Sequence, residues 1–228
     1  LPYESAVPWS EEERLLGEKE TLGLYLTGHP LNRYKNELKD LVSSRLSALQ
    51  PDSKRTQRAA GLVVAMRVMN SRRGRMAALT LDDGSARVEV VVYSDVFQRV
   101  QRFLGKDNVL IAEGIVGVDE FTGGCSMVAD DVFDIEDARM RFARALVVRL
   151  DEANGECAEP ASSQHVLTRL RDTLNPFRDG AARLFIAYEH QAASALISCG
   201  DGWCVSPREE LLERLRGVEG LSGVDVRY

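Results

Sequence analysis

The sequence predicts an α+β protein in which an N-terminal helical segment leads into a five-stranded barrel, followed by a small βαββαβ domain. Five short runs of β-branched and apolar residues, separated by turn residues, occupy residues 58–134. Helical periodicity marks the residues before them, and strand and helix patterns alternate after residue 144. We therefore expect four divisions: a helical segment with a linker at 1–57, the barrel at 58–134, a connecting helix at 135–144 and the second domain at 145–228.

The composition bounds the class of protein. With 228 residues, 44% of them hydrophobic, the chain is long enough to bury one or two cores. The formal net charge of −6 argues against a protein that grips nucleic acid over its whole surface, so any such contact must be a local patch. No apolar run reaches membrane-spanning length and no signal peptide is present, which predicts a cytoplasmic protein without a membrane partner. The opening Leu1-Pro2-Tyr3, without an initiator Met, indicates a fragment of a longer protein.

The cysteines predict neither a metal site nor a disulfide framework. Cys125, Cys157, Cys199 and Cys204 lack the CxxC spacing of zinc sites, and no histidine pattern accompanies them. We expect reduced thiols. The Ser, His and acidic residues show no nucleophile-elbow or metal-ligand spacing. The chain by itself is therefore predicted to hold no cofactor, no metal and no catalytic site.

The N-terminal segment is predicted to contain two helices. Ser10 and Glu13 have the spacing of a capping box, and the helix that they start should run to about Leu24. The stretch Thr27–Pro30 breaks it, and Pro30 opens a second helix. His29 is expected to act in the turn or cap, because no nucleophile or carboxylate is spaced to work with it. Residues 46–57, rich in polar and turn residues, are expected to form a linker.

The barrel is predicted from the order of its elements. The expected strands are Gly61–Val68, Met76–Leu81, Ala86–Tyr93, Val109–Val118 and Cys125–Phe133. A helical pattern, Ser94–Leu104, lies between the third and the fourth. Three strands, a helix and two strands is the order of an OB-fold. Asp82-Asp83 lies in the expected hairpin turn, where paired carboxylates are turn formers rather than metal ligands.

An OB barrel binds single-stranded nucleic acid through its second and third strands and its first and last loops. The first loop carries three arginines suited to phosphates, and the candidate contact residues are Arg72, Arg73, Arg75, Arg87, Tyr93 and Phe121. Two features oppose this reading: the candidate groove has few aromatic rings, and Glu89 would repel phosphate. Weak contact with single-stranded DNA and a solvated basic loop on a structural barrel both remain open.

The C-terminal residues predict a ferredoxin-like domain. A connecting helix with an exposed basic side, 135–144, precedes the elements Ala145–Leu150, Ser162–Leu174, Ala182–Tyr188, Ala193–Ser198, the helix ending at Arg216 and the strand Val224–Tyr228. This order is the split βαβ pattern. Two helices would cover one face of an antiparallel sheet, and the other face or an edge would be free for a partner.

Several phrases resemble those of one protein family. The stretch Glu18–Leu31, with the sequence EKETLGLYLTGHPL, closely resembles the segment that precedes the OB domain in the catalytic alpha subunits of bacterial DNA polymerase III. Matches at Ala60–Val64, Leu79–Asp83 and Trp203–Pro207 follow in the family's order. The resemblance implies a fragment of a replicative DNA polymerase that contains the OB domain and, at 145–228, a domain that binds the tau subunit of the clamp loader.

The resemblance also implies what this fragment lacks. The family's catalytic aspartates lie far upstream, and so does its sliding-clamp motif; Gln164–Thr168 mimics the start of that motif but lacks the aromatic residue. A polymerase parent, single-stranded DNA and tau are therefore the expected enzyme and partners, and the sliding clamp is expected to bind only through upstream residues. The candidate tau contacts are Trp203, Arg208, Leu211 and Tyr228. Alternatively, Trp203 packs under the last helix against Leu211 and Leu215.

Two other classes of function explain less of the sequence. An OB module that binds tRNA as an appended domain of a synthetase would explain the barrel, but it leaves the second domain unexplained. An independent enzyme would need a catalytic constellation that the spacing of residues does not provide.

Overall fold

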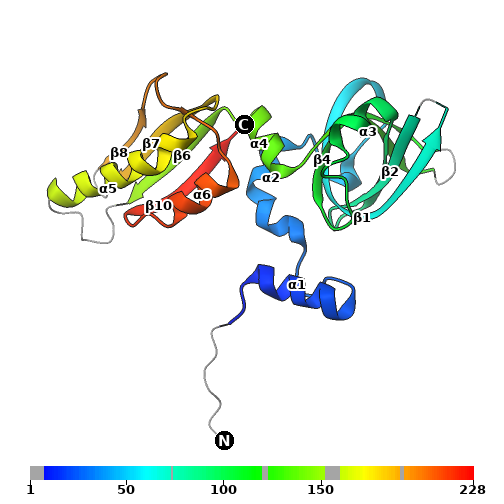
Figure 1. The fold of residues 1–228 in the computed structure, drawn as a ribbon, viewed down its shortest axis with the longest axis horizontal. Helices are drawn as coiled ribbons and strands as arrows, with labels where there is room; N and C mark the ends of the chain where they lie inside the picture. The colour runs from blue at the N-terminus through cyan, green and yellow to red at the C-terminus, as the bar shows by residue number, and fades with distance from the viewer. Residues whose placement is uncertain (1–7, 73, 120–122, 152–159, 191–192) are drawn as a thin grey trace, which may run out of the picture. The chain divides into compact units, whose positions relative to one another are not determined.

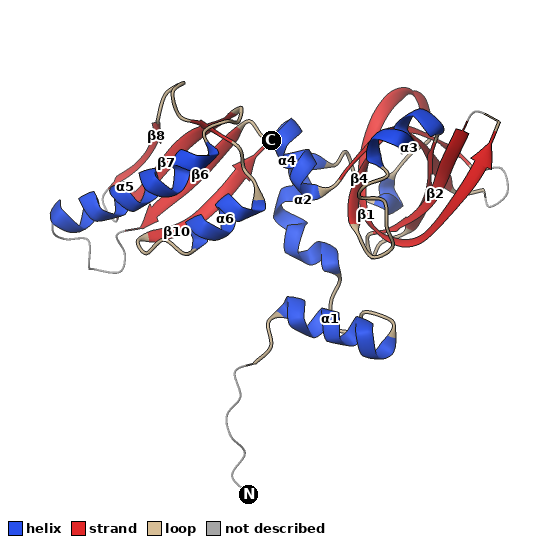
Figure 2. Cartoon of the chain, viewed as in Figure 1, coloured by secondary structure: helices blue, strands red, loops and turns tan. Residues whose placement is uncertain are grey.

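The structure is a computed structural model that describes residues 8–72, 74–119, 123–151, 160–190 and 193–228. The chain divides into two compact units, residues 1–132 and residues 133–228. The first contains the helical segment and a barrel, and the second contains a sheet covered by helices (Figures 1 and 2). The α+β class expected from the sequence is confirmed. Within the described residues, no helix is both long and apolar enough to span a bilayer.

The first helix, α1 (Glu11–Leu22), begins at the expected capping box. The Ser10 hydroxyl accepts a hydrogen bond from the backbone amide of Glu13 at 3.2 Å, and the Glu13 carboxylate accepts from that of Ser10 at 2.9 Å. Gly23, with φ of 75°, ends the helix in the left-handed conformation that glycine adopts without strain. The second expected helix begins as a 3₁₀ turn, η1 (Pro30–Tyr34), and continues as α2 (Lys35–Leu41).

Several contacts attach the helical segment to the barrel, among them those of Lys19, Leu46 and His29. The Lys19 ammonium lies 2.8 Å from the Asp107 carboxylate. The amide of Leu46, in the short turn η2 (Leu46–Ala48), donates to the Asp83 carboxylate at 3.0 Å. His29 caps η1, because its Nδ1 accepts from the Leu31 amide, and its Nε2 lies 3.9 Å from Asp82. The expected capping role of His29 is confirmed.

The barrel has the OB-fold order expected from the sequence. Its strands are β1 (Asp52–Ser71), β2 (Gly74–Asp82), β3 (Arg87–Val92), β4 (Val109–Val118) and β5 (Cys125–Phe133). They close in the order β1-β2-β3-β5-β4, with β3 and β5 parallel and α3 (Ser94–Val100) between β3 and β4 in the chain. Leu79, Val90 and Met127 are among the fully buried residues that fill the interior.

The first strand is much longer than expected. It begins at Asp52, so the prediction that residues 52–57 form part of a linker is wrong. These polar residues become a strand because they pair with β4: Gln57 lies opposite Gly114. A register shift between Val63 and Ala65 marks the place where β1 turns from its partner β4 toward β2. Beyond it, the exposed ends of β1 and β2 form a projection, which we call the hairpin arm, Ala65–Met76.

The second unit is a sheet covered by two helices on one face. Its elements are α4 (Ile135–Phe142), β6 (Ala145–Asp151), α5 (Pro160–Leu174), η3 (Asn175–Phe177), β7 (Ala182–His190), β8 (Ala193–Ser198), β9 (Cys204–Val205), α6 (Glu209–Arg216) and β10 (Leu221–Arg227). The strand order is β10-β6-β7-β8, and β9 also pairs with β7. Figure 1 shows α5 and α6 together in front of the sheet, and Leu174 and Leu211 pack with Leu146 in the core beneath them.

The ferredoxin-like strand order is wrong, although the order of elements along the chain was predicted. In a split βαβ unit, another strand separates the two strands that the helix connects. Here β6 pairs directly with β7, in parallel, and the sheet is therefore mixed rather than antiparallel. The hairpin from β7 to β8 then places β8 at the outer edge. The order of strands and helices along the chain is the same in the ferredoxin-like sheet and in the observed sheet, so the periodicity of the sequence could not distinguish the two strand orders.

The edge of the sheet is interrupted between β8 and β9. Leu184 in β7 accepts a hydrogen bond from the Cys199 amide at 3.1 Å and donates its own amide to the carbonyl of Trp203 at 3.0 Å. Residues 200–202 therefore leave the edge of the sheet after Cys199, and Trp203 rejoins it at the same residue of β7, Leu184. The predicted turn at Gly200-Asp201-Gly202 therefore lies between β8 and β9, which together form one edge along β7.

A buried ion pair joins α4 to α6. The Arg139 side chain is 1% exposed and its guanidinium donates a hydrogen bond to the Glu209 carboxylate. The expectation of an exposed basic side on the connecting helix is wrong for Arg139, whereas Arg141 and Arg144 are exposed. Arg139 can be buried because Glu209 in α6 neutralises its charge. The sequence around Arg139 gives no sign of this partner, which is 70 residues away.

Candidate functional site

The outer face of the barrel is defined by the registers of its strands. Residues opposite each other in neighbouring strands point to the same side of a sheet. One row across β1, β2, β3 and β5 contains Ala65, Thr80, Glu89 and Ser126, and the next contains Arg67, Ala78, Val91 and Val128. These rows lie opposite the buried row of Leu79, Val90 and Met127. We call this surface the outer face.

The charged groups beside this surface are largely paired. The Arg67 guanidinium lies 3.0 Å from the Glu89 carboxylate, and that of Arg87 lies 2.7 Å from Asp82. The expected repulsion between Glu89 and phosphate is thus reduced by Arg67. Arg87, one of the proposed contacts, would have to exchange Asp82 for a phosphate. The outer face itself therefore supplies little unopposed positive charge.

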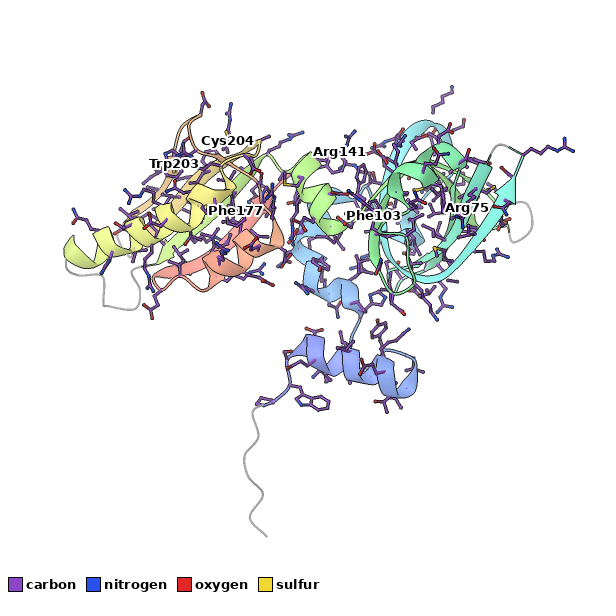
Figure 3. All side chains as sticks on the ribbon, viewed as in Figure 1. Arg75, Phe103, Arg141, Phe177, Trp203 and Cys204 are labelled. Carbon is purple, nitrogen blue, oxygen red and sulfur yellow. The ribbon has the colours of Figure 1, made fainter. Side chains whose placement is uncertain are left out.

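The hairpin arm carries exposed cations. Arg72 and Arg75 are both exposed near its end. Arg75 is labelled in Figure 3, and its guanidinium lies 5.8 Å from the centre of the Phe97 ring in α3. Arg73 lies outside the described residues. Met66, Val68 and Met69 are exposed on the same arm. The sequence did not reveal these exposed apolar residues, because Met66 and Val68 fall within the expected strand Gly61–Val68 and Met69 follows it directly.

The predicted nucleic-acid contacts do not form a single cluster. Tyr93 is 52% exposed and directly follows β3 at the end where the arm lies, since a side chain at Gly74 would come 3.2 Å from Cβ of Ser94. Arg87 lies at the other end of β3, about 20 Å away at the rise of a strand. Phe121 lies outside the described residues. The structure therefore groups Arg72, Arg75 and Tyr93, and it separates them from Arg87.

The Asp82-Asp83 pair forms a turn, as predicted. Asp83 accepts hydrogen bonds from the amides of Ser85 at 2.8 Å and Ala86 at 3.1 Å, and Asp82 accepts from the amide of Gly84 at 2.8 Å. Burial raises the pKa of Asp83, but the hydrogen bonds, led by the Ser85 hydroxyl, outweigh it and lower the pKa below its ordinary value. Over the described part of the chain, three or more His, Cys, Asp or Glu side chains nowhere gather as a metal site would require.

The proposed partner residues of the second unit lie in different environments. Trp203 is half-buried against the core, with the Arg178 guanidinium 4.4 Å from the centre of its ring (Figure 3). Arg208 lies on the surface and pairs with Asp179 at 2.7 Å. Tyr228 is half-buried. Leu211 is 0% exposed in the core, unlike the other three candidate contacts.

The sheet of the second unit has a second face, on the side away from α5 and α6. Strand register places Ala145, Val147 and Arg149 of β6 on this side, next to Phe185 and Ala187 of β7. A shallow depression of about 550 Å³ lies there, lined by these residues together with Tyr188, Ser194, Ala195, Leu196 and Arg227. We call this surface the open face. Sequence reasoning anticipated a free face or edge but named none of its residues.

Two protein families have models that match parts of the chain. Residues 58–135 match the OB-fold nucleic acid binding domain. Residues 169–220 match the C-terminal domain of the DNA polymerase III alpha subunit. The matched ranges fall on the barrel and on the second unit, respectively.

The chain is also similar to complete proteins and to a solved structure. It is 41% identical to the DNA polymerase III alpha subunit of Escherichia coli K12 over 229 residues, and 37% identical to that of Vibrio cholerae over 228 residues. Each alignment covers 99% of this chain and 19% of the relative, so the chain spans about a fifth of these proteins. A domain of replication protein A from Methanococcus maripaludis matches 40% of this chain and 93% of its own, with 16% identity and a TM-score of 0.34.

Proposed function

Because the chain is homologous over 99% of its length to DNA polymerase III alpha subunits and corresponds to their C-terminal region, we propose that it is the non-catalytic tail of a replicative DNA polymerase. In this proposal the parent protein polymerises DNA through upstream residues and works in the cytoplasm. The tail organises contacts: the barrel touches single-stranded template, and the second unit binds the tau subunit of the clamp loader. The division into two compact units supports two separate roles.

For the nucleic-acid role, the hairpin arm is the best candidate surface. Arg72 and Arg75 are exposed there, while Arg67 and Arg87 are held by carboxylates. Exposed Met69 and Tyr93 offer apolar and aromatic surface beside these cations, which suits the bases and phosphates of a single strand. A single stacking ring and few phosphate contacts predict weak binding. The chain's net charge of −6 keeps the contact local.

The salt dependence of binding tests this role. Replacing Arg72 and Arg75 by Ala is expected to weaken binding to a single-stranded oligonucleotide and to reduce the slope of log K against log salt by about 0.7 for each lost phosphate contact. The matched control replaces Lys54 and Arg55, two exposed cations in the half of β1 that pairs with β4. A slope that is the same in the arm variant and in the unmodified chain would leave the barrel a purely structural element.

For the protein-binding role, the second unit is the candidate. It has its own core, and one face of its sheet lies uncovered by its helices. Removing residues 134–228 keeps all five strands of the barrel and is expected to abolish binding to purified tau. Titration calorimetry with the full chain and the shortened chain measures the difference. If both chains bind tau with equal affinity, the site lies on the first unit and this assignment is wrong.

A further inference from the structure

An ion pair lies across the outer face of the barrel. The Arg67 guanidinium, from β1, donates a hydrogen bond to the Glu89 carboxylate, from β3, at 3.0 Å. Strand β2 runs between them, so the two side chains together reach over two strand spacings, about 10 Å. Ala78 of β2 lies opposite Arg67, and Thr80 lies opposite Glu89. The small side chains at these two positions leave room for the bridge.

The same side of the sheet carries groups that suit contact with bases. Residues two apart on a strand point to the same side, so Met69 shares the side of Arg67. Tyr93 continues β3 with an extended backbone and shares the side of Val91, which lies in the row of Arg67. Met69 and Tyr93 are both exposed. Arg67 is therefore a cation on the same side as an aromatic ring and an apolar side chain, the combination that single-strand binding uses.

The contact between Arg67 and Glu89 is easily exchanged. Their side chains are 71% and 41% exposed, and an ion pair in contact with water contributes little to stability. A phosphate can therefore replace the carboxylate without disturbing the barrel. The pair of Arg87 with Asp82 differs, because Asp82 also accepts a hydrogen bond from the Gly84 amide at 2.8 Å and belongs to the β2–β3 turn.

We propose that Glu89 competes with the phosphates of single-stranded DNA for Arg67 and thereby limits the affinity of the barrel for the strand. This inference rests on the proposed function, in which the barrel touches single-stranded template, and it adds a residue that opposes the contact. While the ion pair is formed, the carboxylate neutralises the cation on the side of Tyr93 and holds negative charge where a phosphate would bind. Binding there exchanges one anion for another, so the net gain in free energy is small.

The test measures binding of a labelled single-stranded oligonucleotide to the full chain by fluorescence anisotropy at several salt concentrations. Glu89→Gln keeps the shape of the side chain and removes its charge, so Arg67 becomes available to a phosphate. The slope of log K against log salt is expected to steepen by about 0.7, the effect of one further phosphate contact on a single strand. At about 0.1 M salt, this corresponds to an affinity about fivefold higher than that of the unmodified chain.

Two further variants separate the release of Arg67 from a general loss of negative charge. The double variant Arg67→Ala, Glu89→Gln lacks the released cation and should lose the gain in both affinity and slope. Glu113→Gln removes a carboxylate that lies 3.4 Å from the Arg58 guanidinium, where β1 pairs with β4. About 30 Å of strand separates Arg58 from Arg67, so Glu113→Gln should bind within about twofold of the unmodified chain and with the same slope. Thermal unfolding of each variant verifies that the barrel is intact.

The outcomes separate this inference from the function on which it rests. If replacing Arg72 and Arg75 weakens binding while Glu89→Gln changes neither affinity nor slope, the barrel binds the strand without Arg67 and the inference is overturned. A gain that persists in the double variant, or an equal gain in Glu113→Gln, also overturns it, because the loss of any carboxylate would then explain the effect. A gain that depends on Arg67 supports the inference, even if Arg72 and Arg75 contribute nothing. If neither the unmodified chain nor Glu89→Gln binds the oligonucleotide, the nucleic-acid role and the inference are both overturned.

Discussion

At the scale of single residues, the β2–β3 turn depends on the carboxylate of Asp83. It receives hydrogen bonds from Ser85 and Ala86 and reaches across to the amide of Leu46. Asp83→Ala leaves these donors without their partner, which should lower the free energy of unfolding by about 1–3 kcal/mol. Chemical denaturation measures the loss. Asp130→Ala, at an exposed carboxylate on β5, is the control, and an equal effect in both variants would contradict the role of Asp83.

His29 predicts a pH dependence of stability. Burial lowers the pKa of His29, and the nearby carboxylates of Asp82 and Asp83 oppose the shift without cancelling it. A histidine whose pKa is lower in the folded state binds protons more readily when unfolded, so its contribution is present above about pH 6.5 and is lost as the pH falls below that value. The free energy of unfolding should therefore decrease from about pH 7 to pH 5.

The variant His29→Asn isolates this effect. Asparagine keeps a side-chain acceptor for the amide of Leu31 and does not titrate. Its unfolding free energy should change less between the two pH values than that of the unmodified chain, as measured by urea denaturation at each pH. A pH dependence as steep as that of the unmodified chain would assign the titration to other groups.

Single residues also show which features of the site could be predicted from sequence. The turn role of Asp82-Asp83 and the capping role of His29 depend on neighbours along the chain, and both were predicted. The pairing of Arg67 with Glu89 and the burial of Arg139 against Glu209 depend on residues brought together by folding. No local pattern reveals such partners. The pairing of Arg87 with Asp82 is likewise not evident from the sequence, so Arg87 and Arg75 were predicted to be equally available to phosphate.

At the scale of elements, one glycine determines how closely β4 and β5 approach. A side-chain carbon at Gly114 would lie 2.0 Å from the carbonyl oxygen of Val128, far inside the contact distance. Gly114→Ala should therefore force the two strands apart and lower the free energy of unfolding by about 1–3 kcal/mol or more. Gly117→Ala, on the same strand with open space around it, is the control. Thermal denaturation distinguishes them, and equal midpoints would contradict the close approach.

Elements with strong local signals were predicted well, and elements that depend on a distant partner were not. The bounds of β4, β5 and β8 agree with the strands read from the sequence. The first half of β1 was assigned to a linker, because its polar residues become a strand only by pairing with β4. The parallel pairing of β6 with β7 was missed for the same reason.

At the scale of the whole molecule, the proposed role predicts that the chain does not synthesise DNA alone. Phosphoryl transfer by a polymerase needs metal ions held by clustered carboxylates. The purified chain is expected to leave a primer unextended when template, Mg²⁺ and all four deoxynucleotides are supplied. Gel analysis of the labelled primer measures this, with a complete polymerase as the positive control. Extension that requires Mg²⁺ and persists through further purification would show a catalytic site in this tail.

The divided pairing of β1 has a consequence for how the barrel moves. The half before the register shift at Val63 and Ala65 closes the barrel through β4, and the half after it belongs to a hairpin with β2 alone. The arm is thus able to fray and re-form in microseconds while closure persists for as long as the native state does. Amide hydrogens of Arg67 and Val68 should exchange with solvent much faster than that of Ala59, which faces β4 because the neighbouring Arg58 directs its own amide to Ser43. The single strand β1 would then contain a half that opens rapidly, in the hairpin arm, and a half that exchanges slowly, where it closes the barrel.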